Sequence, residues 1–223
     1  ENDHVIEIGT GWGSFALHAA SNYGCKITTT TISEEQYQLA TERVAEAGLQ
    51  DKIKIVQKDY RLLEGQYDKL VSIEMIEAVG LAYLGNYFER CAALLKPAGR
   101  MLIQAITIAD QHFEFSKRNV DFIQRYIFPG GALPSVTVLT NTATDLTDLR
   151  MTALEDITEH YAMTLHKWRE KFYENVETIR ELGYDNRFLR MWEYYLCYCE
   201  GGFTERSIGC VQAEFMKPAY QRI

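Results

Sequence analysis

Short apolar runs recur along the chain, and each is followed by a longer stretch in which apolar and polar residues are mixed. The first run, Val5-Ile6-Glu7-Ile8, predicts a buried parallel strand, and residues 14–23 predict a helix behind it. The same pattern predicts further strands over 25–32, 53–56, 67–73, 100–108 and 208–216, and further helices over 33–47, 84–95, 160–182 and 186–201.

This alternation predicts an α/β fold, a mostly parallel, doubly wound, Rossmann-like sheet with right-handed crossovers. The rhythm breaks over 110–134, which is rich in aromatic residues and contains Phe128-Pro129-Gly130-Gly131. We interpret this stretch as an inserted helical segment over the active site. No repeat or linker divides the chain, so residues 1–223 are expected to form one domain.

Composition and charge narrow the class of function. The net charge of −8 argues against a nucleic-acid-binding protein, which needs a concentrated basic surface. Lys117, Arg118 and Arg125 form a small basic group that we interpret as solvated surface. No apolar run approaches the ~20 residues that span a bilayer. Five cysteines at scattered spacings indicate a reducing compartment, and no metal-ligand motif occurs.

Three glycines at alternate positions follow the first strand, in Glu7-Ile8-Gly9-Thr10-Gly11-Trp12-Gly13. Glycine permits a tight turn and a close approach of the backbone to a ligand. The spacing is not the G-x-G-x-x-G of dinucleotide sites. It resembles the first motif of class I S-adenosylmethionine-dependent methyltransferases, which implies that Glu7, Gly9, Gly11 and Gly13 hold the amino-acid end of that cofactor.

The second predicted strand ends without the acid that many such methyltransferases use to hold the ribose. The hydroxyl of Thr31 and the amide of Gln36 can replace it. Gln36 equally fits a structural role in the capping box Ser33-Glu34-Glu35-Gln36. Asp59 and Tyr60 follow the third strand, where a class I enzyme contacts the adenine.

Five motifs in order extend the resemblance over essentially the whole chain. They are Ile-Gly-Thr-Gly-Trp-Gly (8–13), Thr-Ile-Ser-Glu-Glu-Gln (31–36), Glu-Met-Ile-Glu-Ala-Val-Gly (74–80), Phe-Pro-Gly-Gly (128–131) and His-Tyr-Ala-Met-Thr-Leu (160–165). Together they resemble the cyclopropane-fatty-acyl-phospholipid synthase family. The second motif is the usual ribose-side pattern of that family, which implies a cofactor role for Thr31, Ile32 and Gln36.

The resemblance implies an enzyme that transfers the methyl group of S-adenosylmethionine to the cis double bond of an unsaturated phospholipid acyl chain and closes a cyclopropane ring. It also implies bicarbonate as the base, held by Glu77, the backbone of Ile106 and Tyr161. The family's bicarbonate-binding histidine is Gln104 here. Because glutamine cannot carry a positive charge, we predict weaker bicarbonate binding. We assign no catalytic role to Glu74 and expect it to face the cofactor or solvent.

Attack of an alkene on a sulfonium methyl group leaves a carbocation, which aromatic faces can stabilise without capturing it. Each candidate side chain also fits ordinary core packing, and the group suits an apolar channel for an acyl chain. The candidates are Tyr126, Phe128, Trp192, Tyr194, Tyr195 and Phe203.

The family also has a Tyr-x-Cys-Gly segment before the first strand, and this chain begins too late to contain it. We therefore expect a fragment that lacks an N-terminal region covering the cofactor. The expected setting is the cytoplasm, with peripheral association at the membrane surface where phospholipid acyl chains are found. A homodimer is left open.

Three other functions stay open at this point. Lipid C-methylation would give a methyl-branched or methylene product if the cation lost a different proton. A small-molecule N-methyltransferase would accept amines and need no bicarbonate. A binding-only domain would keep the fold without turnover.

Overall fold

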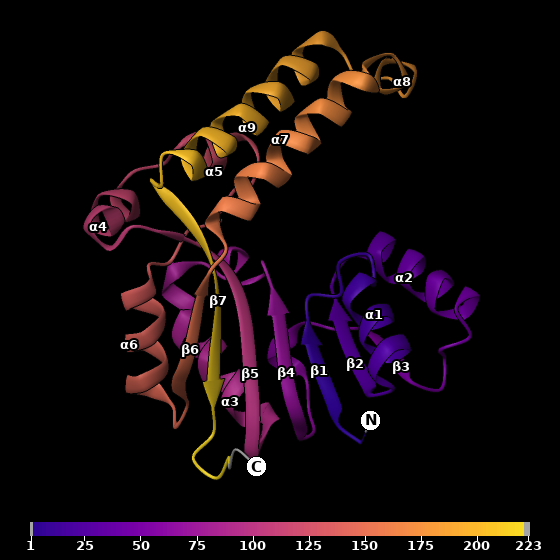
Figure 1. Ribbon diagram of the computed structural model, residues 1–223, viewed down its shortest axis with the longest axis vertical. Coiled ribbons are helices and arrows are strands. Elements are labelled where there is room, and N and C mark those ends of the chain that lie inside the picture. The colour runs from indigo at the N-terminus through magenta and orange to yellow at the C-terminus, as the bar shows by residue number, and fades with distance from the viewer. Residues whose placement is uncertain (1, 221–223) are drawn as a thin grey trace.

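The computed structural model describes residues 2–220, which form a seven-stranded sheet in the order β3-β2-β1-β4-β5-β7-β6 (Figure 1). β1 pairs in parallel with β2 and β4, whereas β7 runs antiparallel between β5 and β6. The predicted mostly parallel, doubly wound sheet is confirmed. The strands are β1 (His4–Ile8), β2 (Lys26–Thr31), β3 (Ile53–Gln57), β4 (Tyr67–Ile73), β5 (Leu95–Ile108), β6 (Arg150–Asp156) and β7 (Ile208–Met216).

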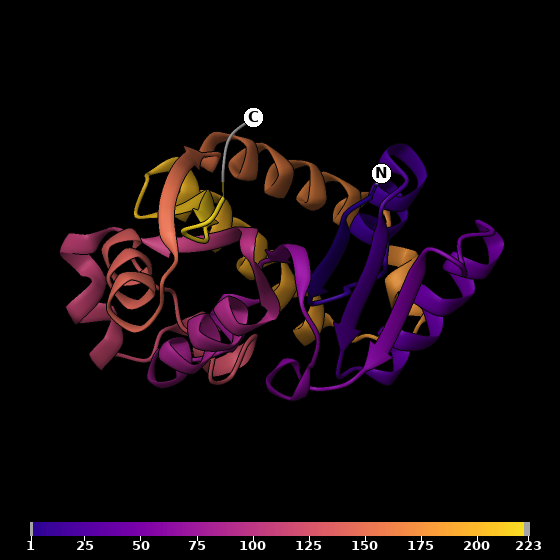
Figure 2. The same ribbon diagram turned by 90° about the horizontal axis from the view of Figure 1, so that it is seen from below.

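Helices cover both faces of the sheet, as the view along it shows (Figure 2). They are α1 (Ser14–Tyr23), α2 (Glu34–Glu46), α3 (Leu84–Leu94), α4 (Asp110–Arg118), α5 (Phe122–Tyr126), α6 (Val136–Leu146), α7 (Thr158–Glu174), α8 (Val176–Glu181) and α9 (Asn186–Thr204). Short 3-10 turns lie at Tyr60–Leu62, Ile76–Ala78 and Leu81–Tyr83. None of the helices in residues 2–220 is long and apolar enough to cross a bilayer.

Two cores arise because successive side chains of a strand point to opposite faces of the sheet. Val5 packs into a core with buried residues of α1 and α2. Ile6 and Ile8 pack into the other core, with residues of α3 and α6. The first apolar run is therefore buried on both sides, as its continuous hydrophobicity indicated.

A third core joins α7 and α9, an antiparallel pair that rises from the carboxyl ends of the parallel strands (Figure 1). Leu165 and Phe172 of α7 are buried in it with Leu196 and Phe203 of α9. The stretch interpreted as an insertion, 110–134, contains α4 and α5. α5 lies below α9, and the rings of Phe122 and Tyr194 meet there at a centroid distance of 4.6 Å.

Some element boundaries differ from the sequence-based expectations. α6 and β6 were not predicted, and β6 is an edge strand whose residues are mostly exposed. The segment Lys96-Pro97-Ala98-Gly99 was expected to separate a helix from a strand, but β5 begins at Leu95. The single helix predicted over 160–182 is divided at Asn175 into α7 and α8.

Candidate active site

The predicted site residues gather at one edge of the sheet, because the carboxyl ends of parallel strands meet there. The glycine turn follows β1, the Thr31–Gln36 segment follows β2, and Asp59 follows β3. Glu77 lies in the turn after β4, and Gln104 and Ile106 lie towards the end of β5. The first turn of α7, after β6, adds Tyr161.

The glycine turn depends on backbone angles that favour glycine. Gly9, Gly11 and Gly13 have φ values of +100°, +51° and +85°. The backbone N–H groups of Gly9 and Thr10 donate to the carbonyl of Thr30 over 3.1 and 2.9 Å, which fixes the turn against β2. A Cβ on Gly13 would lie 3.2 Å from the Cβ of Ala40, whereas a Cβ on Gly11 would meet nothing within 4 Å. The open side of the turn at Gly11 is where a ligand can approach the backbone.

Glu7 is a buried acid beneath this turn. Only 2% of the residue is exposed, and burial raises the pKa of its carboxyl from 4.5 to about 8. Its Oε2 atom is buried without a hydrogen-bond partner. A buried carboxylate of this kind needs a partner, and a cationic ligand is a suitable one. S-Adenosylmethionine carries an ammonium group at its amino-acid end, so Glu7 and the turn fit that cofactor.

The segment after β2 is held by its own side chains. Ser33 caps α2 by accepting a hydrogen bond from the N–H of Gln36. The Gln36 side chain accepts from the Thr31 hydroxyl at 2.8 Å, and the Ser33 N–H donates to the same hydroxyl at 3.1 Å. In a complete capping box the Gln36 side chain would accept from the Ser33 N–H. Here it accepts from the Thr31 hydroxyl instead. Ile32 is 78% exposed between them and presents an apolar side chain to whatever binds at this edge.

Asp59 and Tyr60 are anchored by neighbours within the protein. The Asp59 carboxylate accepts from the backbone and the guanidinium of Arg61, at 2.9, 3.0 and 2.6 Å. The Tyr60 ring meets Tyr87 edge-on with centroids 5.6 Å apart. A role for either residue at the adenine stays a prediction.

Glu77 and the backbone of Ile106 come together as expected. The Glu77 Oε1 atom accepts a hydrogen bond of 2.6 Å from the Ile106 N–H, while Oε2 is buried without a partner. Burial, with a smaller contribution from the nearby charge of Glu74, raises the pKa of Glu77 to about 7. A large fraction of Glu77 is therefore protonated at neutral pH, when it can donate a hydrogen bond.

Glu74 was expected to face the cofactor or solvent, and the structure places its partly buried carboxylate among the residues expected to hold the base. Its Oε1 accepts from the Gln104 side chain at 2.7 Å, and its Oε2 accepts from the Tyr161 hydroxyl at 2.5 Å. The residue has φ +51°, a left-handed conformation that L side chains rarely adopt. This backbone turns the carboxylate towards β5 and α7, among the residues expected to hold the base.

Gln212 of β7 is a further member of the site that the sequence analysis missed. It lies opposite Gln104 in the antiparallel pairing of β5 and β7, and its side-chain amide donates to the side-chain Oε1 of Gln104 at 2.9 Å. That contact orients the Gln104 amide so that its Nε2 atom faces Glu74. The available signal was a single polar glutamine within the otherwise apolar run Cys210-Val211-Gln212-Ala213.

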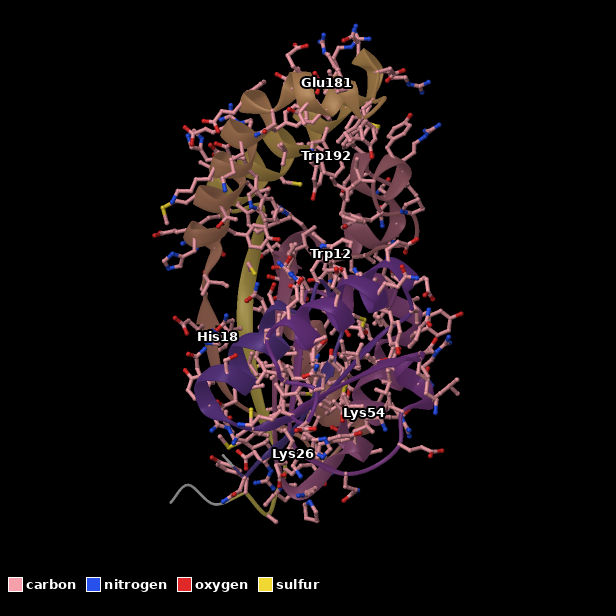
Figure 3. All side chains as sticks on the ribbon, turned by 90° about the vertical axis from the view of Figure 1, so that its right-hand side faces the viewer. Trp12, His18, Lys26, Lys54, Glu181 and Trp192 are labelled. Atoms are coloured by element: carbon pink, nitrogen blue, oxygen red, sulfur yellow. The ribbon has the colours of Figure 1, made fainter. Side chains whose placement is uncertain are left out.

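Tyr161, which contacts the Glu74 carboxylate, packs in one apolar core with the aromatic side chains Trp192 and Tyr195. Tyr161 stacks on Phe203 with centroids 4.5 Å apart, and Tyr195 lies 5.0 Å from Trp192 and 6.3 Å from Phe128. In Figure 3, Trp192 on α9 lies above the level of Trp12 in the glycine turn. Burial raises the pKa of Tyr195, with smaller contributions from Cys199 and Glu74.

These features define a class I S-adenosylmethionine-dependent methyltransferase. The family model described as mycolic acid cyclopropane synthetase matches residues 1–213, and the chain belongs to that family. The predicted resemblance is therefore confirmed.

Two curated relatives illustrate the range of the family. The chain is 43% identical over 203 residues to the tuberculostearic acid methyltransferase UfaA1 of Mycobacterium tuberculosis, covering 91% of this chain and 47% of the relative. It is 37% identical over 214 residues to the cyclopropane-fatty-acyl-phospholipid synthase of Escherichia coli, covering 96% and 53%. The chain thus spans about half the length of the curated relatives it matches.

Solved structures agree on the fold. The cyclopropane synthase MmaA2 of Mycobacterium tuberculosis superposes with a TM-score of 0.88 at 22% identity, covering 97% of this chain and 78% of the other. The mycolic acid cyclopropane synthase CmaA1, complexed with SAH and CTAB, gives 0.89 at 24% identity with the same coverage.

Proposed function

We propose that this chain is the catalytic part of an enzyme that transfers the methyl group of S-adenosylmethionine to the cis double bond of an unsaturated phospholipid acyl chain, forming a cyclopropane ring. The observation that carries the proposal is that carboxyl groups and aromatic rings lie together at one edge of the sheet. A cluster of carboxyl groups contacts a stacked pair of aromatic rings. The first suits removal of a proton, and the second suits a carbocation in an apolar environment.

The glycine turn, Glu7 and the Thr31–Gln36 segment are proposed to hold the cofactor. Glu7 would pair with the cofactor's ammonium group, and Thr31, Ile32 and Gln36 would contact the ribose side. When bound, S-adenosylmethionine supplies an electrophilic methyl group. The aromatic rings of α7 and α9 then have two tasks, to exclude water and to stabilise the cation left by methyl transfer.

Bicarbonate, which the resemblance implies as the base, stays a prediction. The Ile106 N–H, the Gln104 amide and the Tyr161 hydroxyl, all expected to bind it, are already hydrogen-bonded to carboxylates of this chain. The residues present therefore do not fit bicarbonate without rearrangement, although the unpartnered Oε2 of Glu77 can still accept one further hydrogen bond. No step of the mechanism is routed through bicarbonate.

Contact with a membrane surface is part of the proposal and is supported by the inserted segment. Phe115 and Val120 are 73% and 74% exposed beside the basic group noted in the sequence. The Arg125 guanidinium lies over the Tyr126 ring at 5.6 Å. Exposed apolar side chains beside basic ones are a combination that binds anionic lipid surfaces.

A second candidate is C-methylation that yields a methyl-branched or methylene chain. It is favoured by the 43% identity to a protein named as a tuberculostearic acid methyltransferase. Both candidates begin with the same transfer and differ in how the cation is resolved.

The test uses the full-length protein that carries this chain, cofactor labelled in its methyl group, and vesicles of a cis-unsaturated phospholipid. We expect label in the acyl chains. Tyr161→Phe removes a hydrogen bond to the carboxyl cluster and Glu77→Gln changes the cluster itself, and we expect each to lower the rate by ~100-fold or more, the usual loss when proton transfer is impaired. Glu42→Gln, on the exposed side of α2, serves as the control and keeps the full rate. Unchanged rates in both site variants would remove the site assignment.

A further inference from the structure

The place expected for an external base is already taken by a side chain of this protein. The Tyr161 hydroxyl and the Gln104 amide, two of the groups predicted to hold bicarbonate, both donate to the Glu74 carboxylate, at 2.5 and 2.7 Å. The Ile106 N–H donates to Glu77 at 2.6 Å. An added anion would have to displace one of these two carboxylates.

The backbone at Glu74 is shaped to deliver its side chain to this place. The residue has φ +51°, and its N–H donates to the carbonyl of Gln104 at 2.9 Å, which ties the turn after β4 to the end of β5. A left-handed conformation at a non-glycine residue persists only where its surroundings enforce it, and such positions cluster at active sites. Glu74 is also only partly buried, so a substrate can reach it.

We propose that the Glu74 carboxylate is the base that removes the proton in this enzyme, in place of bicarbonate. The inference rests on the proposed function, since it needs a carbocation formed by methyl transfer to the double bond. As the methyl group moves, its bond to sulfur breaks with the electron pair going to sulfur. The π pair of the alkene forms the new C–C bond and leaves a cation on the adjacent carbon. Glu74 takes a proton from the transferred methyl group, and the pair of that C–H bond closes the ring.

The hydrogen bonds of Glu74 leave it able to accept that proton. Each carboxylate oxygen has two lone pairs, and the contacts with Gln104 and Tyr161 use one on each oxygen. Both donors are neutral. Burial and the neighbouring Glu74 charge raise the pKa of Tyr161, so this hydroxyl keeps its proton and stays a donor. After turnover, the proton on Glu74 passes to solvent.

Charge also favours an internal base. Within residues 2–220, no salt bridge joins Glu74 or Glu77 to a lysine, an arginine or a histidine. A bicarbonate ion would add negative charge beside two carboxyl groups with no cation to offset it. Gln104, a neutral residue, suits a site whose negative charge is built into the protein.

The test compares wild type, Glu74→Gln and Glu74→Gly in buffer freed of carbon dioxide, using full-length protein and labelled cofactor. We expect wild-type ring formation to be unchanged by added bicarbonate. Glu74→Gln should lose 10²–10⁴-fold of the rate, the usual contribution of a base, with or without bicarbonate. Glu74→Gly keeps the left-handed φ and frees the donors of Tyr161 and Gln104, so added bicarbonate or formate should restore part of its rate.

Two further readouts separate a base from a structural residue. A cation that finds no base is captured by water, so the Glu74 variants should release a methyl-branched alcohol in place of the ring. Calorimetry should show unchanged cofactor binding in both. Wild-type turnover that requires bicarbonate, or Glu74→Gln activity above a tenth of wild type, would overturn the assignment of Glu74 as the base. The proposed function would stand in either case. A wild type that places no label in lipid would remove the proposed function together with the assignment of Glu74.

Discussion

Glu7→Gln should stabilise the protein in the absence of cofactor, by an amount that grows with pH. The Glu7 carboxyl has a pKa of about 8 in the folded protein against an ordinary value of 4.5, because burial opposes its charge. A folded pKa above the unfolded one means that the folded state binds more protons between these values. Stability from this group is therefore present below pH 4.5 and is lost as pH rises to 8.

The magnitude follows from the shift. Each pKa unit corresponds to ~1.4 kcal/mol, so the shift amounts to roughly 5 kcal/mol once Glu7 is ionised, as an upper bound. Only 2% of Glu7 is exposed, so solvent screens little of this effect. Glutamine has the same shape and never ionises. The stability of Glu7→Gln relative to wild type should therefore increase by about 1 kcal/mol per pH unit between pH 5 and pH 8.

The assay is urea denaturation of wild type and Glu7→Gln at several pH values from 5 to 9, without cofactor. The difference in free energy of unfolding isolates Glu7, because every other titrating group is shared. Glu42→Gln, an exposed substitution on α2, should show a difference that does not change with pH. A Glu7→Gln difference that stays constant within ~0.5 kcal/mol from pH 5 to 9 would refute the reasoning. The affinity for the cofactor should rise with pH in wild type, because ionised Glu7 can pair with the ammonium group. It should not rise in Glu7→Gln.

Gly13→Ala should lower stability by ~1–2 kcal/mol, because φ is +85° there, whereas Gly201→Ala inside α9, where a Cβ meets nothing within 4 Å, should raise it slightly in thermal melts. Gln212→Leu should lower the turnover rate about 10-fold with little change in cofactor affinity, because the amide that faces Glu74 loses its orienting contact. Phe115→Ser should reduce the fraction of protein that sediments with anionic vesicles, and Leu62→Ser, at a residue that is 60% exposed but distant in sequence, should not.

Local sequence was sufficient for the cofactor side of the site. The glycine turn could be predicted because its positive φ angles favour glycine. The apolar run before it predicted a strand that is buried on both faces of the sheet. The Ser33 cap of α2 was likewise predictable, since its hydrogen bond spans only three residues. These features are determined by residues that lie close together along the chain.

Contacts between distant segments could not be predicted in the same way. Glu74 meets Tyr161, which is 87 residues away, and Gln104 meets Gln212, which is 108 residues away. Spacing along the chain carries no direct signal of such pairs. β6 was missed because its edge position leaves most of its residues exposed, without the apolar alternation that marks a half-buried strand.

The most direct test of the central claim is the fate of a carbon-13 methyl group carried by the cofactor. Full-length protein would be incubated with this cofactor and vesicles of a cis-monounsaturated phospholipid, and the recovered lipid analysed by proton NMR. We predict carbon-13 in the methylene of a cyclopropane ring at the former double bond, and label in a branched methyl or methylene group would instead support the second candidate. Label absent from the acyl chain, with cofactor bound and intact, would contradict the account.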